Sequence, residues 1–170
     1  MRAYPEAMTR RYVLGGLLAV VVGLVVAPGR ADERVWGGAV LRHRRRAIVA
    51  RYLEVLPAGL EPATQPDRVI LRWAYEGESG MPSEIEQVRM DRLGDQLAAA
   101  VEPDGLATLV AVSVGDGRCE WLFYARAQRE FIGRLNDVLR TTGGKPPIQI
   151  ELARDPQWTM YRVFHHDATR

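Results

Sequence analysis

Residues 108–126, Thr-Leu-Val-Ala-Val-Ser-Val-Gly-Asp-Gly-Arg-Cys-Glu-Trp-Leu-Phe-Tyr-Ala-Arg, decide the fold. Two runs of β-branched and aromatic residues flank Gly115-Asp116-Gly117, and a glycine-rich turn of this kind accepts the positive φ angles of a tight hairpin. The first run is apolar from Leu109 to Val112, as in a strand that is covered on both faces. The stretch therefore predicts a β-hairpin at the centre of a sheet.

The second run of the hairpin alternates, so its two faces differ. Trp121 and Phe123 share one face, while Glu120 and Tyr124 lie on the opposite face. If the two apolar rings contact helices, Glu120 and Tyr124 belong to the open face of the sheet.

Amphipathic helices are predicted before and after the hairpin. The first covers residues 82–101, with Pro82 at its first position, where a missing N–H costs nothing. The second covers residues 128–140. Their apolar side chains recur at helical spacing and predict two buried stripes: Met90, Leu93, Leu97 and Val101 in the first helix, and Phe131, Leu135, Val138 and Leu139 in the second.

Strands complete this pattern at residues 68–75 and 148–152, where apolar and polar side chains alternate. The resulting order of strand, helix, strand, strand, helix, strand predicts an α+β fold of the ferredoxin-like split βαβ type, an antiparallel sheet with two helices on one face. Residues 47–56 predict an extra N-terminal strand at a sheet edge, with a helix as the second choice. We expect one α+β domain over residues 47–164.

The chain after the last strand predicts a short C-terminal helical segment. Asp155 followed by Pro156 is a strong helix start, and one or two turns then place Trp158 and Tyr161 on one side. We expect these rings to close over the open sheet face and residues 165–170 to form a solvated tail.

The N-terminal residues 1–31 have the layout of a secretory signal. A basic start is followed by an apolar run at residues 12–27 and by small residues before a cleavage after Ala31. Residues 9–14 also resemble a twin-arginine export signal. We favour export to the periplasm or cell envelope over the alternative, an uncleaved membrane anchor.

Residues 32–46 are interpreted as a basic linker, because Gly37-Gly38 would interrupt a helix before the cluster Arg42-His43-Arg44-Arg45-Arg46. The alternative is that this cluster lies on anionic lipid headgroups, so that the chain contacts a membrane through residues 12–27 and through Arg42 to Arg46.

Charge and cysteine content exclude several classes of protein. Beyond residue 31 the chain has 19 basic and 20 acidic residues, so we expect no nucleic-acid partner, which would need a basic face. The single cysteine, Cys119, excludes an internal disulfide and predicts a buried thiol.

Three motifs make the chain resemble the bacterial family catalogued as domain of unknown function 695. They are Gly-Met-Pro-Ser-Glu-Ile-Glu at residues 80–86, Gly-Arg-Cys-Glu-Trp-Leu-Phe-Tyr at residues 117–124, and Asp-Pro-Gln-Trp-Thr-Met-Tyr at residues 155–161. The resemblance covers residues 47–164. It implies the fold more than a function, since the family has no established activity; some members carry the domain beside one that looks like a protein inhibitor of a ribonuclease.

No standard catalytic motif is present in the sequence, neither a nucleophile turn nor a zinc helix nor a phosphate-binding loop, and we predict no catalytic residue, cofactor or metal. The remaining polar and aromatic side chains are candidates for a binding site: Glu86, Arg118, Glu120, Tyr124, Asp155, Trp158 and Tyr161. Arg118 is expected to pair with Asp155 or Glu120.

Three functions follow from these side chains. The favoured one is a protein-binding or regulatory module without catalytic activity, which uses a sheet face or an edge strand. The alternatives are a small-ligand sensor with a pocket between the sheet and residues 155–161, and a carboxylate-dependent hydrolase in which Glu86 converges with Glu120 or Asp155.

Overall fold

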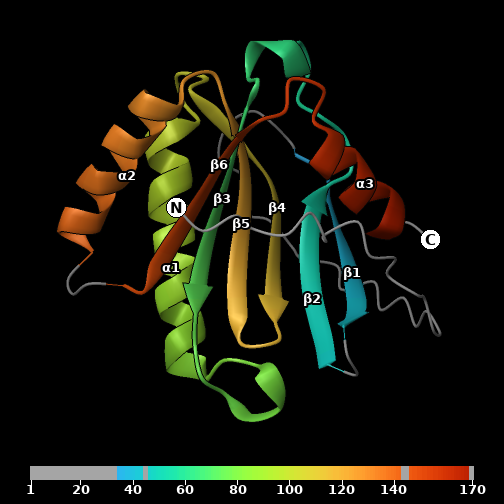
Figure 1. Ribbon diagram of the computed structural model, residues 1–170, viewed down its shortest axis with the longest axis vertical. Helices are drawn as coiled ribbons and strands as arrows, with labels where there is room; N and C mark the ends of the chain where they lie inside the picture. The colour runs from blue at the N-terminus through green and yellow to red at the C-terminus, as the bar shows by residue number, and fades with distance from the viewer. Residues whose placement is uncertain (1–33, 44–45, 143–145, 169–170) are drawn as a thin grey trace, which may run out of the picture.

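A computed structural model describes residues 34–43, 46–142 and 146–168, which form a mixed α+β fold (Figure 1). Six strands pair into one antiparallel sheet in the order β1-β2-β4-β5-β3-β6. The strands are β1 Trp36–His43, β2 Arg46–Leu53, β3 Asp67–Ala74, β4 Ala107–Gly115, β5 Arg118–Ala125 and β6 Ile148–Arg154. The helices are α1 Glu84–Val101, α2 Gln128–Thr141 and α3 Thr159–Ala168, with two 3₁₀ turns at Pro62–Thr64 and Glu78–Gly80.

The predicted hairpin is confirmed as the centre of the sheet. Asp116 and Gly117 link β4 to β5 and both have positive φ, 51° and 77°, as a tight two-residue hairpin turn requires. A register shift between Leu109 and Ala111 marks a bulge in β4. The bulge lets Val110 and Ala111 bury on the same face, which accounts for the uninterrupted apolar run.

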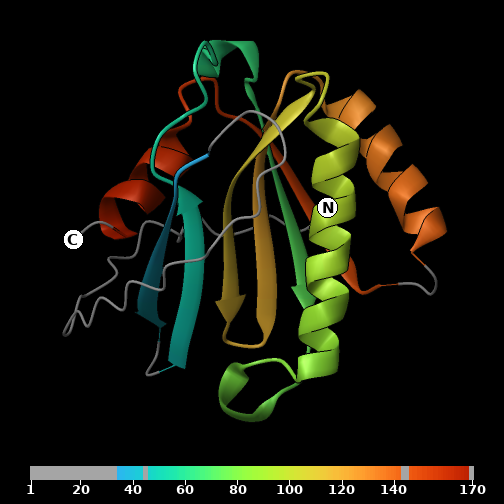
Figure 2. The same ribbon diagram turned by 180° about the vertical axis from the view of Figure 1, so that it is seen from behind.

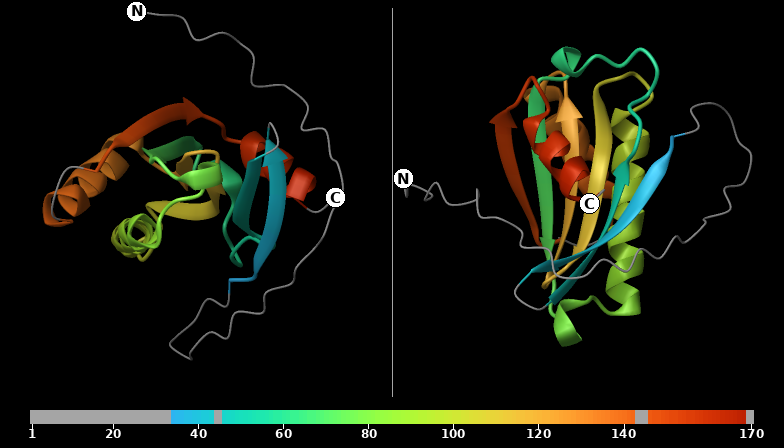
Figure 3. Two further views of the ribbon diagram at one scale, coloured as in Figure 1. Left: turned by 90° about the horizontal axis from the view of Figure 1, so that it is seen from below. Right: turned by 90° about the vertical axis from the view of Figure 1, so that its right-hand side faces the viewer.

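Helices cover both faces of the sheet, α1 and α2 on one side and α3 on the other, as the end-on view in Figure 3 shows. The α1 and α2 side buries the larger core, in which Trp73, Trp121 and Phe123 are at most 2% exposed. The α3 side buries a second core around Tyr124 and Trp158. Because β5 sends Trp121 to the first core and Tyr124 to the second, the predicted assignment of its faces is confirmed.

The mixed α+β class is therefore confirmed, and the expected order of elements is present from β3 to β6. The ferredoxin-like assignment stays a prediction. The buried stripe of α1 is found as expected; in α2 Phe131, Leu135 and Val138 are buried, whereas the fourth predicted residue, Leu139, is only partly buried. The start of α1 differs: Ser83 is the N-cap and accepts a hydrogen bond from the Glu86 N–H, so Pro82 precedes the helix instead of occupying its first position.

The linker interpretation of residues 32–46 is wrong at Trp36–His43, which form the edge strand β1 paired with β2. Gly37 does not interrupt this strand, because a strand accepts glycine where another chain approaches closely. A Cβ at Gly37 would lie 2.7 Å from the Tyr52 ring and from the Glu54 carboxylate. The predicted extra strand is β2, which lies inside the sheet rather than at its edge.

The C-terminal segment is longer than predicted. Helix α3 begins at Thr159 and runs to Ala168, so His165 and His166 belong to a helix and not to a solvated tail. Among the helices of the described ranges, none has the length and apolar character needed to cross a membrane. The predicted signal or anchor, residues 1–31, lies outside the described residues.

Two helix glycines offer a matched test of core packing. A Cβ at Gly94 in α1 would lie 2.7 Å from Trp121 Nε1, whereas a Cβ at Gly133 in α2 meets no atom within 4 Å. We expect Gly94→Ala to lower the free energy of unfolding by about 1–3 kcal/mol through overpacking, and Gly133→Ala to raise it by up to about 1 kcal/mol through helix propensity. Chemical denaturation measures both, and changes of the same sign would contradict the packing of α1 on β5.

Candidate functional site

The seven predicted site residues do not form one site. Glu86 lies on the α1 side, where its Oε1 accepts a hydrogen bond of 2.5 Å from Trp73 Nε1 and its Oε2 lies 3.3 Å from Arg89. Trp73 belongs to the core on this side of the sheet. Tyr124, Trp158 and the rest of the second core lie on the opposite face of the sheet. The convergence of carboxylates that a hydrolase would need is therefore not formed by Glu86.

A row of alternating charges crosses β5, β3 and β6 on the α3 side of the sheet, and we call it the charged row. Glu120 lies 3.4 Å from Arg118 Nε and accepts a 2.6 Å hydrogen bond from Arg72 Nε. Arg72 also donates to Glu151 at 2.8 Å, and Glu151 accepts from Arg68 at 2.6 Å. Each carboxylate of the row is thus shared by two arginines.

The charged row contains the predicted site residues Arg118 and Glu120. It also contains three residues that were not predicted as site residues: Arg68, Arg72 and Glu151. Burial lowers the pKa of Arg72, but hydrogen bonds and attraction from Glu120 and Glu151 outweigh it and raise the pKa. The signal was present in the sequence: Arg68 and Arg72 alternate on the polar face of β3, where Arg72 pairs in register with Glu120. Because Glu120 and Glu151 are both paired with arginines, the row stabilises the sheet, and neither carboxylate of the row is free for acid–base chemistry.

The remaining four predicted residues meet beneath α3. Tyr124 donates its hydroxyl to Asp155 at 2.7 Å, and its ring stacks on Trp158 with centroids 4.3 Å apart. Trp158 Nε1 donates to the Gln65 carbonyl at 2.9 Å. The hydroxyl of Tyr161 donates to the Leu53 carbonyl at 2.5 Å. Each ring therefore has a hydrogen-bond partner inside the protein.

These rings fill the space where the sensor hypothesis placed a pocket. Tyr124 and Trp158 are 0% exposed and Tyr161 is 6% exposed. Burial raises the pKa of Tyr124, and so does its hydrogen bond to Asp155. Residues 155–161 fold over the sheet as predicted, and their rings pack there as part of a buried core.

Asp155 caps the start of α3 from a distance of four residues. Its carboxylate accepts hydrogen bonds from the N–H groups of Thr159 at 2.9 Å and Met160 at 3.0 Å. Burial raises the pKa of Asp155, but the hydrogen bonds from Met160, Tyr124 and Thr159 outweigh it, so the pKa lies below its ordinary value. The folded protein therefore holds Asp155 ionised.

We expect Asp155→Asn to lower the free energy of unfolding by about 1–2 kcal/mol at neutral pH. Because the folded pKa is depressed, this contribution is present above the unfolded value of about 3.9 and is lost as the pH falls through the folded pKa. Urea denaturation at a series of pH values should show the two proteins converging in acid. The exposed Asp95→Asn on α1 serves as the control, with a change within about 0.5 kcal/mol; an Asp155 effect that persists below both pKa values would contradict the linkage.

Two further groups are accounted for by packing. Cys119 is 1% exposed, and burial raises the pKa of its thiol, which makes it a poor nucleophile. His165 packs edge-on against Tyr52 with centroids 5.3 Å apart, and its Nε2 lies 3.2 Å from the Glu54 carbonyl. Within the described residues, no three His, Cys, Asp or Glu side chains are grouped as metal ligands.

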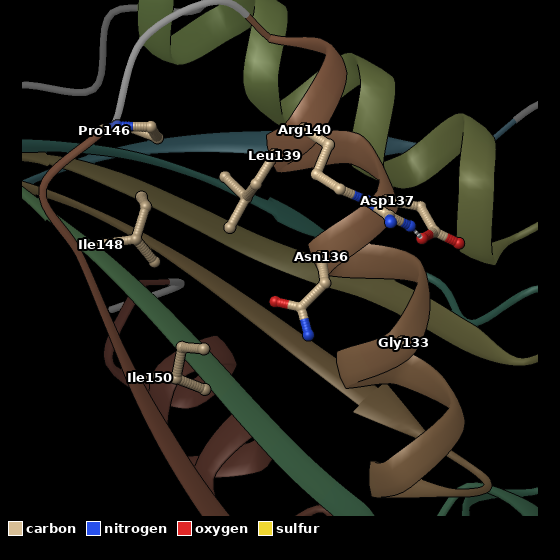
Figure 4. A pocket seen from close by; sticks show the side chains of 8 residues that line it. All are labelled: Gly133, Asn136, Asp137, Leu139, Arg140, Pro146, Ile148 and Ile150. Atoms are coloured by element: carbon tan, nitrogen blue, oxygen red, sulfur yellow. Dashed lines mark hydrogen bonds and ion pairs between the residues drawn. The ribbon is translucent and has the colours of Figure 1, made fainter.

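An open groove lies elsewhere, between α2 and the edge strand β6 (Figure 4). Its volume is about 730 Å³, and Leu139, Ile148 and Ile150 point into it. Ile150 and its neighbour Leu152 are each 42% exposed. The groove is lined by Gly133, Asn136, Asp137, Leu139, Arg140, Pro146, Ile148 and Ile150. No residue of this groove was among the predicted site residues.

Comparison with known proteins gives a family but no activity. A family model described as "Family of unknown function (DUF695)" matches residues 58–165, which include the charged row, the aromatic cluster beneath α3 and the groove. No curated protein matches the chain. Since the matched region spans most of the described fold, the chain belongs to the family of unknown function DUF695.

Proposed function

We propose that this protein is a protein-binding module that accepts an extended segment of its partner along β6. One observation carries the proposal: Ile150 and Leu152, both 42% exposed, form an apolar strip on an edge strand beside an open groove. Large apolar side chains gathered beside a hollow are typical of interaction sites.

The edge of β6 favours an extended partner. Within the described residues β6 pairs only with β3, so alternate N–H and C=O groups along its outer side have no partner strand. Such an edge accepts an added strand through main-chain hydrogen bonds, and side-chain pockets then select the sequence. The pocket here is the groove under α2, which would take apolar side chains at every second position of the added strand.

The charges near β6 support this use of the edge. Glu151 is the carboxylate in the middle of the strand, and it is held by Arg68 and Arg72 on the α3 side, facing away from the groove. The Glu151 charge therefore does not prevent another strand from pairing along the apolar side of the edge. Pro146 and Pro147 before the strand and Pro156 after it limit the length of the accepting edge to the seven residues of β6.

The other two hypotheses have less support. A sensor pocket between the sheet and residues 155–161 would have to displace Trp158, which is 0% exposed and stacked on Tyr124. A hydrolase would have to release Glu120 or Asp155 from the arginine or the N–H groups that they bind. The groove requires neither change.

The test begins with a protein retained by the full chain from an extract of the native organism, followed by measurement of the dissociation constant with both proteins purified. We expect Ile150→Arg and Leu152→Arg to weaken binding about tenfold or more, as for central apolar anchors. Gly133→Leu should also weaken binding, because Gly133 lines the groove and a Cβ added there meets no atom within 4 Å, which leaves room for a side chain to occupy the groove.

Val163→Arg is the matched control, since Val163 is 55% exposed on α3, on the other side of the sheet. We expect this variant to bind like the wild type. If Val163→Arg weakened binding while the variants at Ile150, Leu152 and Gly133 did not, the partner would dock on α3 and the proposed site would be wrong.

We also propose that the protein acts outside the cytoplasm. The order of charged, apolar and small residues in residues 1–31 supports export, with a mature N-terminus at Asp32. Mass spectrometry of the native protein tests this location. A mature start at Asp32 is expected, and recovery of an intact Met1 in a soluble cytoplasmic fraction would contradict export.

A further inference from the structure

The hairpin formed by β1 and β2, residues 36–53, differs sharply in charge from the rest of the domain. It carries five arginines and no acidic residue. The chain from residue 54 to residue 170 has 13 basic and 18 acidic residues, an excess of five negative charges. The net charge of the domain is therefore near zero only because a basic hairpin at one edge of the sheet offsets an acidic remainder.

The same hairpin exposes apolar side chains on one face. Val40 and Val49 pair in register, and they are 55% and 48% exposed. They lie on the α1 side of the sheet, since the adjacent Arg51 pairs with Val112 of the core beneath α1. Among the described helices neither α1 nor α2 covers β1 and β2 from this side, as Figure 2 shows.

Arginines frame these valines on both sides. Arg42 is the next β1 residue on this face after Val40, and Arg51 is the next β2 residue after Val49. Both are exposed, and among the described residues neither forms an ion pair. The guanidinium of Arg51 lies 5.2 Å from the centre of the partly buried Trp36 ring. Arg46, by contrast, is paired with Asp116 at 3.2 Å.

We propose that Trp36, Val40, Arg42, Val49 and Arg51 form a docking patch for the surface of an anionic lipid bilayer. Unpaired arginines are attracted to acidic headgroups, a tryptophan prefers the boundary between headgroups and acyl chains, and the two valines add apolar area at the same depth. The combination of apolar and cationic side chains on one flat face fits a lipid surface better than a purely polar partner.

The position of the patch in the chain agrees with a lipid occupant. The described residues begin at Arg34, two residues before β1, and the apolar run at residues 12–27 is separated from β1 by eight residues. Eight extended residues span at most about 29 Å. Until cleavage after Ala31, an apolar run in the bilayer would therefore hold this hairpin near the same surface.

Fluorescence of the mature chain, from Asp32, gives a readout specific to the patch. Trp73, Trp121 and Trp158 are at most 2% exposed, whereas Trp36 is only partly buried, so Trp36 is the most exposed of the four tryptophans. The mature chain is mixed with phosphatidylcholine vesicles that contain a brominated lipid, with and without phosphatidylglycerol. We expect quenching that requires phosphatidylglycerol, is reversed by salt and disappears in Trp36→Phe.

Charge variants test the source of the attraction. Arg42→Gln with Arg51→Gln should lower partitioning onto anionic vesicles by about fivefold for each arginine removed. The control is Arg92→Gln with Arg129→Gln, which removes the same charge from exposed positions on α1 and α2 and should leave partitioning unchanged. Circular dichroism checks that each variant is folded.

Several outcomes would overturn the patch. One is equal loss of partitioning in both double variants, which would reflect net charge alone. Another is sedimentation with vesicles without quenching of Trp36, which would place the contact in another segment. Self-association that depends on Arg42 and Arg51 in the absence of vesicles would assign the hairpin to the acidic body of a second copy.

Discussion

Trp158→Ala is expected to lower the free energy of unfolding by about 3–5 kcal/mol, a large fraction of the stability of a domain of this size. The substitution removes a ring that is 0% exposed and stacked on Tyr124, and it leaves the Gln65 carbonyl without its donor. Trp158 has a φ of 55°, a strained value for a bulky residue that costs about 1–3 kcal/mol. Contacts of the ring hold the backbone in this conformation, so their loss should also loosen the start of α3.

Trp158→Phe is the matched control, because it keeps most of the stacked area and loses the Nε1 donor. We expect a smaller loss of about 1–2 kcal/mol in chemical denaturation. The alanine variant should also bind more of a hydrophobic dye, as the second core becomes accessible. A loss below about 1 kcal/mol for Trp158→Ala, with no added dye binding, would mean that residues 155–161 are not docked on the sheet.

Trp121→Ala is expected to cost about 3–5 kcal/mol, whereas its neighbour Glu120→Ala should cost only about 0.5–1.5 kcal/mol. Trp121 is 2% exposed in the core beneath α1. Glu120 points to the other face, and its removal still leaves Arg72 paired with Glu151 at 2.8 Å. The losses at these two adjacent positions should therefore differ by at least a factor of two.

Denaturation of both variants under the same conditions measures this difference, with Arg118→Gln as a further control at the exposed end of the charged row. Equal losses at positions 120 and 121 would contradict the orientation of β5. A large loss at Glu120 alone would instead make the charged row the main support of the second face.

The central part of the fold could be predicted because local chemistry and tertiary position agree there. Alternating side chains on β5 assigned Trp121 and Tyr124 to opposite faces, and both are buried where the pattern placed them. Asp116-Gly117 specified a turn that only positive φ angles satisfy. In the same way, Trp158 and Tyr161 indicated the closure of the open face, since apolar rings on a short segment need a surface to bury them.

Strand β1 could not be predicted, because its two glycines have low strand propensity and its end runs into the basic cluster that begins at Arg42. The reason for Gly37 is tertiary: the side chains of Tyr52 and Glu54 occupy the space that a Cβ would need. The spacing of residues in the sequence cannot show that the Tyr52 and Glu54 side chains come this close to Gly37. As a result the basic residues around Arg42 were assigned to a linker, and the apolar face that they share with Val40 went unrecognised.

The groove was missed for a related reason. Ile148, Ile150 and Leu152 alternate as core residues do, and only the strand order shows that β6 lies at an edge that α2 leaves partly open. The charged row was missed because its ion pairs depend on the register between β3, β5 and β6. The candidate residues were thus chosen where the sequence is richest in aromatic and acidic groups, which here serve packing.

Helices cover both faces of the sheet except on the α1 side of β1 and β2, so we propose recognition at the β6 edge and on that uncovered face. The β6 edge offers a groove and free main-chain groups for a protein segment. The β1 edge offers arginines and valines for a lipid surface. The two surfaces lie at opposite ends of the strand order, so one bilayer and one partner could be bound together.

Hydrogen exchange of the full chain, free and bound to its purified partner, tests the central claim most directly. We predict that binding protects the backbone amides of β6, Ile148–Arg154, and of the groove side of α2, with no added protection in α3. Protection confined to residues 155–168, with β6 unchanged, would contradict the account and make the segment over the second face the recognition element.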